Sequence, residues 1–156
     1  ADTRLLLVGD GPMRDALRAR CPQAVFAGHR SGEDLAAHYA SADMFLFPSL
    51  TETFGNVTTE AMASGLPVVA FNSAAAGQLI QHGRNGMLAA GLDLPAFVRA
   101  GLPLAGDAAL RAALGIAARE TACRIDWRSV VVRFERIVSQ VIDQSAPASS
   151  PAPAHA

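Results

Sequence analysis

Short apolar runs of strand length recur along the chain, separated by segments with helical spacing. They occupy residues 4–8, 24–27, 44–47 and 67–71, with a weaker run at 87–89. Uninterrupted apolar runs of this length are typical of strands in parallel sheets that are covered on both faces. The pattern therefore predicts five strands and places the first of them, 4–8, in the core.

Helical spacing fills most of the intervals. It predicts helices at 13–20, 56–64 and 78–82, a helix that ends near residue 40, and three more at 95–102, 108–121 and 128–143. The last one carries an apolar face made by Val131, Phe134, Ile137, Val138 and Val141. Ser31 and Asp34 have the spacing of a capping box, and Gly65 provides a stop for the helix at 56–64.

The alternation of strands and helices predicts an α/β fold, a three-layer sandwich around a parallel sheet. Ligands of such sheets bind beyond the carboxyl ends of the strands. The loops that begin near Gly9, Gly28, Pro48 and Asn72 all follow strands. We therefore expect these loops to converge on one edge of the sheet.

Composition narrows the class of protein. The 156 residues fit one domain, predicted at 1–144, and the Ser/Ala/Pro-rich stretch 145–156 is predicted to be a disordered tail. A net charge of −1 gives no support for a nucleic-acid partner, and the apolar runs are far shorter than the ~20 residues of a membrane span. All 13 basic residues are arginine, so a mechanism that needs lysine cannot be completed by this chain.

The most informative stretch runs from residue 48 to residue 67. A strand ends there, a loop carries Glu52, Gly55 opens a helix, and Glu60 follows one turn later. A helix N-terminus binds anions, and two flanking acids suit a ligand that joins a diphosphate to hydroxyl-bearing sugars. Taken alone, Glu60 is equally well explained as a solvated helix acid, and Glu52 would be only a loop acid. Their combination with Gly55 and with the Gly65-Leu66-Pro67 exit favours a binding site.

Other candidate sites are weaker. The Gly9-Asp-Gly-Pro12 turn lacks the third glycine of a dinucleotide fingerprint, so a tight turn is favoured over a phosphate loop and a nicotinamide cofactor is disfavoured. Ser49 lacks the Gly-x-Ser-x-Gly context of a hydrolase nucleophile. No His, Asp and Glu residues have the spacing of metal ligands, so no metal site is predicted.

The stretch Glu52-Thr-Phe-Gly-x-x-x-x-Glu60-Ala-Met-Ala-x-Gly-x-Pro-Val-Val resembles the signature of retaining, nucleotide-sugar-dependent glycosyltransferases of the GT-B architecture, the glycosyl transferases group 1 family. The segment 43–49, the turns at 9–12 and 83–86 and Trp127 follow in the order expected for that family, so the resemblance covers roughly residues 4–142. It implies a Rossmann-like domain that forms the C-terminal half of a two-domain enzyme.

The resemblance also implies roles for individual residues. Glu52 would contact the transferred sugar and act as the catalytic residue, and Glu60 would hold the ribose hydroxyls. The remaining donor-binding residues implied are Thr53 and Phe54, Gly55, Asn56 and Val57, whose N–H groups would cradle the diphosphate, and Gly28, His29 and Arg30 beside the base. The nucleotide sugar would be a substrate, and neither a cofactor nor a metal is implied.

Two departures from the family pattern stand out. Residues 74–78 read Ala-Ala-Ala-Gly-Gln where the family often has Gly-Gly-x-Pro-Glu, which leaves the identity of the donor sugar open. The family's Arg/Lys pair, its first strand and helix, and its acceptor domain would all precede Ala1. A fragment without them is expected to have little or no activity.

The full enzyme is therefore expected to transfer a hexosyl unit to a glycan or lipid acceptor in the cytoplasm. An alternative location for the full enzyme is the inner face of the membrane, with peripheral attachment. Two alternatives remain open at this point. One is a nucleotide-sugar epimerase or phosphorylase-like relative that uses the same half-site, and the other is a non-catalytic nucleotide-sugar-binding module.

Overall fold

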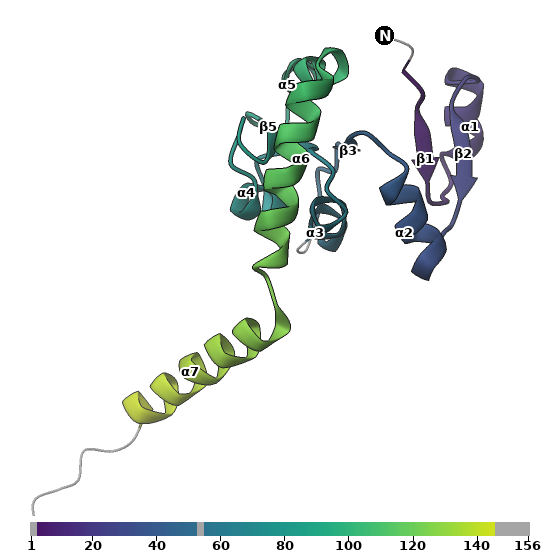
Figure 1. Cartoon of the computed structure of the whole chain (residues 1–156). Coiled ribbons are helices and arrows are strands. Elements are labelled where there is room, and N and C mark those ends of the chain that lie inside the picture. The colour runs from purple at the N-terminus through teal and green to yellow at the C-terminus, as the bar shows by residue number, and fades with distance from the viewer. Residues whose placement is uncertain (1–2, 53–54, 146–156) are drawn as a thin grey trace, which may run out of the picture. The chain divides into compact units, whose positions relative to one another are not determined.

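A computed structural model of the chain describes residues 3–52 and 55–145 (Figure 1). Within these residues strands and helices alternate in the order β1 Leu6–Val8, α1 Arg14–Arg20, β2 Val25–Gly28, α2 Gly32–Ala40, β3 Phe45–Phe47, α3 Asn56–Ala63, β4 Val68–Phe71, α4 Ala74–Leu79, β5 Gly86–Ala89, α5 Leu94–Gly106, α6 Ala108–Cys123 and α7 Trp127–Ser145. The structure divides into two compact units, the first ending at Cys123 and the second beginning at Arg124. Ser145, the first residue of the predicted tail, is the last residue of α7, and the rest of the tail lies outside the described residues.

The strands pair in parallel, as predicted, but in two sheets instead of one. β1 pairs with β2, while β3, β4 and β5 form a three-stranded sheet with β4 in the centre. In the second sheet Phe45 lies opposite Val68, and Val68 opposite Gly86. The α/β class is therefore confirmed, and the loops after the strands gather at two sheet edges rather than one.

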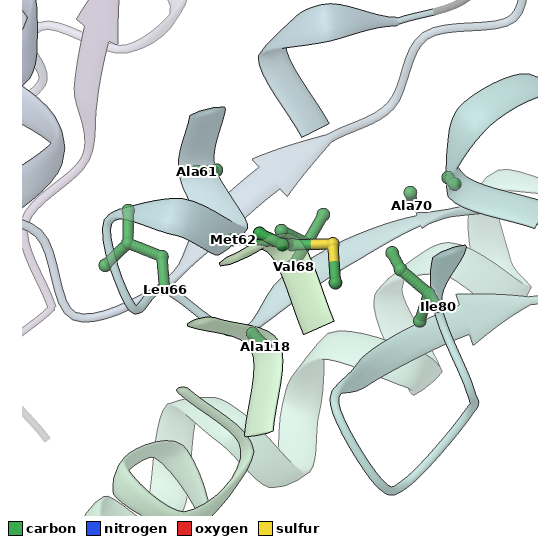
Figure 2. Packing of buried hydrophobic residues seen from close by; sticks show 9 residues of the cluster. Ala61, Met62, Leu66, Val68, Ala70, Ile80 and Ala118 are labelled. Carbon is green, nitrogen blue, oxygen red and sulfur yellow. The ribbon is translucent and has the colours of Figure 1, made fainter. Parts of the chain in front are cut away.

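The central strand β4 is the core of the first unit. Val68, Val69, Ala70 and Phe71 are at most 1% exposed, and successive side chains point to opposite faces. One face packs against Ala61 and Met62 of α3 and against Ala118 of α6 (Figure 2). The opposite face is covered by the side chains of α5 together with Leu114 of α6. Helices thus cover both faces of this sheet, as the three-layer prediction requires, and each fully buried large side chain contributes about 1.5–3 kcal/mol.

The predicted burial of the first strand is wrong. Leu6 and Val8 of β1 are 36% and 40% exposed. The sheet that they share with β2 has only two strands, and α1, the helix between them, buries none of its own residues. An apolar run is buried only where a second layer covers it, and the described residues provide no such layer here.

The helix α3 begins and ends as the sequence predicts. Gly55, its N-cap, has φ 96°, and Gly65 just beyond its end has φ 81°. The N–H of Gly65 donates to the carbonyl of Met62 and the N–H of Leu66 to that of Ala61, which satisfies the last carbonyls and turns the chain into β4. Gly115 of α6 lies against the carbonyl of Gly65 so closely that a Cβ at Gly115 would overlap that oxygen.

Two local predictions fail. Ser31 is the N-cap of α2, but its side chain makes no capping hydrogen bond. Asp34, the other half of the predicted capping box, instead pairs with Arg30 at 3.1 Å and with His38. The fourth helix begins at Ala74, four residues earlier than predicted, and Ala74 itself has φ 44°.

The predicted turn at 83–86 is held by one buried side chain. Asn85 is 3% exposed, and its Nδ2 donates to the carbonyl of Leu79 at 3.1 Å and to Oγ1 of Thr121 at 2.9 Å. Its Oδ1 accepts the N–H of Gln81 at 2.7 Å. Because a buried amide is costly unless its hydrogen bonds are made, this network ties the turn to α4 and α6.

The second unit contains α7. Asp126 caps this helix by accepting the N–H and the hydroxyl of Ser129 at 2.8 and 2.9 Å, and these bonds lower the pKa of Asp126. The predicted apolar face is present, and its five residues, from Val131 to Val141, are 39–66% exposed. Within the described part of the chain, no helix has both the length and the apolar character that crossing a membrane requires.

Candidate functional site

A small cavity lies where β3, β4 and the N-terminus of α3 meet. Its volume is about 10 Å³, room for one water-sized group. Three kinds of side chain line it: aromatic rings, alanine methyl groups, and side chains with hydroxyl or carboxylate oxygens. The lining residues are Phe47, Ser49, Glu52, Gly55, Thr58, Ala70, Phe71 and 73–76.

Glu52 lines this cavity, and its carboxylate is held by a hydrogen bond. The hydroxyl of Ser49 donates to Oε1 of Glu52 at 2.7 Å, a short bond of the kind expected when the acceptor is charged. The other oxygen, Oε2, lies 3.8 Å from the position that a Cβ would take on Gly55. One oxygen of Glu52 is thus anchored to the loop, and the other lies beside the start of α3.

Glycine is required at position 55 because of its backbone conformation, not because neighbouring atoms leave no room for a side chain. A Cβ there would meet its neighbours at ordinary distances of 3.7–3.8 Å, but φ 96° is a conformation that L-residues rarely adopt. The N–H groups of Gly55, Asn56 and Val57 lie at the N-terminal end of α3. N–H groups at this end of a helix have no acceptors within the helix. This terminus offers donors and a positive dipole end to an anion. Thr53 and Phe54, also predicted to bind the donor, lie outside the described residues.

Glu60 lies one turn along α3 and has its own partner. The hydroxyl of Tyr39 in α2 donates to Oε2 of Glu60 at 3.2 Å. The Tyr39 ring packs edge-on against Phe45 of β3, with centroids 5.7 Å apart. Burial, then the charge of Glu60 and this hydrogen bond, raise the pKa of Tyr39 to about 12. The phenol therefore remains a donor over the whole physiological range.

The structure does not bring Gly28, His29 and Arg30 into the cavity. Gly28 is the last residue of β2 in the other sheet, and His29 and Arg30 follow it; the N–H of Gly9 donates to the carbonyl of Gly28. His29 is exposed, and Arg30 pairs with Asp34. None of the residues that line the cavity comes from this loop. Their role beside a base stays a prediction.

The turn at 9–12 is closed by its own side chain. Asp10 accepts the N–H of Gly11 at 2.9 Å and pairs with Arg14 at 3.1 Å. The helix begins at Arg14, so Pro12 lies outside it. A carboxylate that accepts the N–H of Gly11 fits the tight-turn interpretation better than a phosphate loop.

Thr58 is a cavity residue that the sequence did not predict. This residue of α3 is 0% exposed, lines the cavity and has an Oγ1 atom without a hydrogen-bond partner in the described structure. No sequence signal separates Thr58 from Thr59 beside it. Among the described residues, no three His, Cys, Asp or Glu side chains gather in a way that could hold a metal ion.

Residues 1–107 match the protein family described as "Glycosyl transferases group 1". The chain belongs to this family. Over 138 residues it is 37% identical to the sulfoquinovosyl transferase SQD2 of Arabidopsis thaliana, covering 85% of this chain and 27% of that protein. Over 128 residues it is 42% identical to a GDP-mannose-dependent alpha-mannosyltransferase of Mycolicibacterium smegmatis, covering 81% of this chain and 33% of that protein.

Solved structures agree with this family membership. The sucrose-phosphate synthase of Thermosynechococcus elongatus superposes with a TM-score of 0.75 at 27% identity, covering 90% of this chain and 39% of that one. HepE of Anabaena, solved in complex with UDP and glucose, gives 0.70 at 26% identity, covering 86% and 39%. The predicted GT-B glycosyltransferase fold is confirmed. The chain spans about a third of the length of the two relatives named above.

Proposed function

We propose that the chain is the donor-binding part of a retaining glycosyltransferase. The whole enzyme transfers a hexosyl unit from a nucleoside-diphosphate sugar to a glycan or lipid acceptor. The observation that carries the proposal is the carboxylate of Glu52, which Ser49 holds at 2.7 Å beside the N-terminus of α3, in a chain of the glycosyl transferases group 1 family.

In this proposal the diphosphate binds at the start of α3. The N–H groups of Gly55, Asn56 and Val57 donate to its oxygens, and the helix dipole adds a favourable field. These donors also stabilise the negative charge that grows on the diphosphate as the bond to the sugar breaks. Their orientation is fixed before the reaction, because the φ of Gly55 sets the direction of the first turn.

The two carboxylates bind the two sugars of the donor. Glu52 accepts hydrogen bonds from hydroxyls of the transferred sugar and orients it, which makes it the catalytic residue of this half of the site. Glu60 accepts from the ribose hydroxyls through its Oε1, since Oε2 already accepts from Tyr39. Carboxylates suit both tasks because each has two oxygens and several acceptor positions for vicinal hydroxyl groups.

The remaining elements of the reaction are assigned to other parts of the full protein. The acceptor and a positively charged pair for the diphosphate are contributed by an N-terminal domain and by an earlier segment of this domain. The chain without them binds donor weakly and turns over little. The full enzyme works in the cytoplasm, where it can attach peripherally to the membrane.

Calorimetric titration with UDP, GDP and ADP tests the donor site. The full-length protein is expected to bind one of the three, and Glu60→Ala is expected to weaken that binding at least tenfold, about 1.4 kcal/mol. Glu120→Ala, which removes an exposed carboxylate from α6, serves as the matched control and leaves the affinity unchanged. If the wild-type protein binds none of the nucleotides at millimolar concentration, the proposed function is wrong.

A transfer assay tests the reaction. With the matching nucleotide sugar and an acceptor, Glu52→Gln is expected to lower kcat strongly while the affinity for the free nucleotide stays within twofold, about 0.4 kcal/mol. Equal turnover in Glu52→Gln and wild type would remove Glu52 from the reaction. Release of free sugar without acceptor dependence would point to hydrolysis in place of transfer.

A further inference from the structure

The hydroxyl of Thr58 is a buried polar group that the structure leaves without a partner. Thr58 is 0% exposed, and its Oγ1 has no hydrogen bond to any described residue. An unsatisfied buried hydroxyl costs about 1–3 kcal/mol, so such groups in native proteins usually have a partner when the protein is at work. Thr58 lines the cavity together with Glu52, and a group that enters the cavity can provide that partner.

Two oxygens lie on the same side of Gly55, a residue that lines the cavity. Oγ1 of Thr58 and Oε2 of Glu52 both lie 3.8 Å from the position that a Cβ would take on Gly55. Gly55 adds no side chain between these two oxygens, and all three residues line the cavity. A small group in the cavity can thus reach a carboxylate acceptor and a hydroxyl, which can donate or accept.

The chemistry of the walls selects the occupant. The volume of about 10 Å³ admits one hydroxyl-sized group, and the carboxylate of Glu52 in the cavity wall repels a phosphate oxygen. Hydroxyls of Ser49 and Ser73 add hydrogen-bonding capacity, while the methyl groups of Ala70, Ala74 and Ala75 limit the space. An uncharged hydroxyl on a ring that stays outside the cavity fits all three conditions.

We propose that Thr58 is a sugar-recognition residue whose Oγ1 hydrogen-bonds one hydroxyl of the transferred hexose, with Glu52 contacting the same hydroxyl. The inference rests on the proposed function and deepens it, because it assigns the cavity to the sugar and not to the diphosphate. The side chain therefore contributes to the affinity for the nucleotide sugar and contributes nothing to the affinity for the free nucleotide.

The test compares two ligands on four proteins. In the full-length enzyme, Thr58→Val keeps the shape of the side chain and removes the hydroxyl, whereas Thr58→Ser keeps the hydroxyl. Thr59→Val is the matched control, since Thr59 is the next residue of α3 and its Oγ1 is also buried and unpartnered, but it does not line the cavity. Each variant and the wild type are titrated with the nucleotide sugar and with the free nucleoside diphosphate.

We expect Thr58→Val to weaken binding of the nucleotide sugar by about three- to tenfold and to leave binding of the nucleoside diphosphate unchanged. Thr58→Ser is expected to retain most of the affinity for the nucleotide sugar, and Thr59→Val to match the wild type for both ligands. If Thr58→Val fails to fold, Thr58→Ala is compared with Thr58→Ser in its place.

The outcomes separate this inference from the proposed function. Equal weakening of both ligands by Thr58→Val would move the contact to the nucleotide and overturn the sugar assignment. No effect of Thr58→Val on either ligand would also overturn the sugar assignment, and a water molecule would then be the expected occupant of the cavity. In both cases the wild type still binds the nucleotide sugar, whereas a wild type that binds neither ligand contradicts the proposed function itself.

Discussion

The phenol of Tyr39 donates a 3.2 Å hydrogen bond to Oε2 of Glu60 and so joins α2 to α3. The ring of Tyr39 is itself fixed by its edge-on contact with Phe45 of β3. A carboxylate that is held at one oxygen loses little freedom when its other oxygen binds a ligand, which favours binding. In the proposed function, Tyr39 is thus a positioning residue that acts through Glu60.

Tyr39→Phe removes this hydrogen bond and keeps the ring. We expect the variant to bind the nucleotide about three- to tenfold more weakly and to discriminate less between ribo- and 2′-deoxyribonucleotides, because Glu60 is less well oriented. Calorimetry with both nucleotides measures the effect. The same substitution in a Glu60→Ala background should have no further effect, and an additive loss in the double variant would show that Tyr39 acts by another route.

The titration of Tyr39 gives a second prediction. Its pKa is raised from 10.0 to about 12, chiefly by burial and then by Glu60. Because the folded state holds the phenol proton more tightly, the stability contribution is complete below pH 10 and is lost as the pH rises from about 10 to about 12. Tyr39 is the sole tyrosine of the 156 residues, so the ultraviolet absorbance of tyrosinate in this chain reports it alone.

Glu60→Gln is the matched control for that titration. It removes the charge and keeps an acceptor, so the midpoint should move down from about 12 while burial keeps it above 10.0. A wild-type midpoint at 10.0, or one that Glu60→Gln leaves in place, would contradict the environment described for Tyr39.

Ser49→Ala is expected to release Oε1 of Glu52. The 2.7 Å bond holds the carboxylate at the cavity, and without it the side chain can rotate away from the sugar. We expect kcat to fall by about tenfold, while the KM for the donor changes little if the diphosphate supplies most of the binding. Steady-state transfer kinetics measure both constants. Ser49→Thr, which keeps a hydroxyl, should recover activity, and a change confined to KM would argue against a role in orienting Glu52.

Gly115→Ala should destabilise the first unit. The added Cβ would overlap the carbonyl oxygen of Gly65, so α6 and the end of α3 must move apart. Overpacking of this kind costs about 1–3 kcal/mol, which thermal or denaturant unfolding can measure. Gly106→Ala is the control, because a Cβ there meets nothing within 4 Å. Equal stability of the two variants would show that α6 does not approach Gly65 as described.

Acidification should weaken α7. Asp126 accepts two hydrogen bonds from Ser129 only as a carboxylate, which is why its pKa lies below the ordinary value of 3.8. Because the pKa of Asp126 is lower in the folded state, the cap contributes its full stability above pH 3.8. This contribution is lost as the pH falls through the folded-state pKa of Asp126. Circular dichroism of a peptide covering 124–145 should show the loss of helix. Asp126→Ala should start less helical at pH 7 and lack that transition.

The sequence predicted the elements around β4 well because several local signals agreed there. Gly65 and the proline after Leu66 define where α3 ends, and the apolar run at 67–71 has the length of a strand and is buried in the structure. The capping box at Ser31 and Asp34 failed because the motif does not reveal that Arg30 and His38 compete for the same carboxylate. Local patterns therefore predict reliably where neighbouring side chains do not compete for the same group.

The sequence could not predict which residues are buried or which hydrogen-bond partners their side chains have. Leu6 and Val8 have the composition of a core strand, yet whether a strand is buried depends on the layer that covers it. Glu52 and Gly55 were found through their spacing, whereas Thr58 was not, because an unpartnered hydroxyl arises from the packing of α3 against the chain around it. The same limit hid Tyr39, which is distant from Glu60 in the sequence.

The buried side chain of Asn85 also bears on how this protein ages. Asn85 is followed by Gly86, and asparagine next to glycine deamidates readily when the side chain and backbone can move. Here the amide is held at three points, by Leu79, Thr121 and Gln81. An aspartate in its place would lose both Nδ2 donors and set a charge against the carbonyl of Leu79. The folded protein thus protects its most vulnerable amide, and deamidation at this position would record how often the first unit opens.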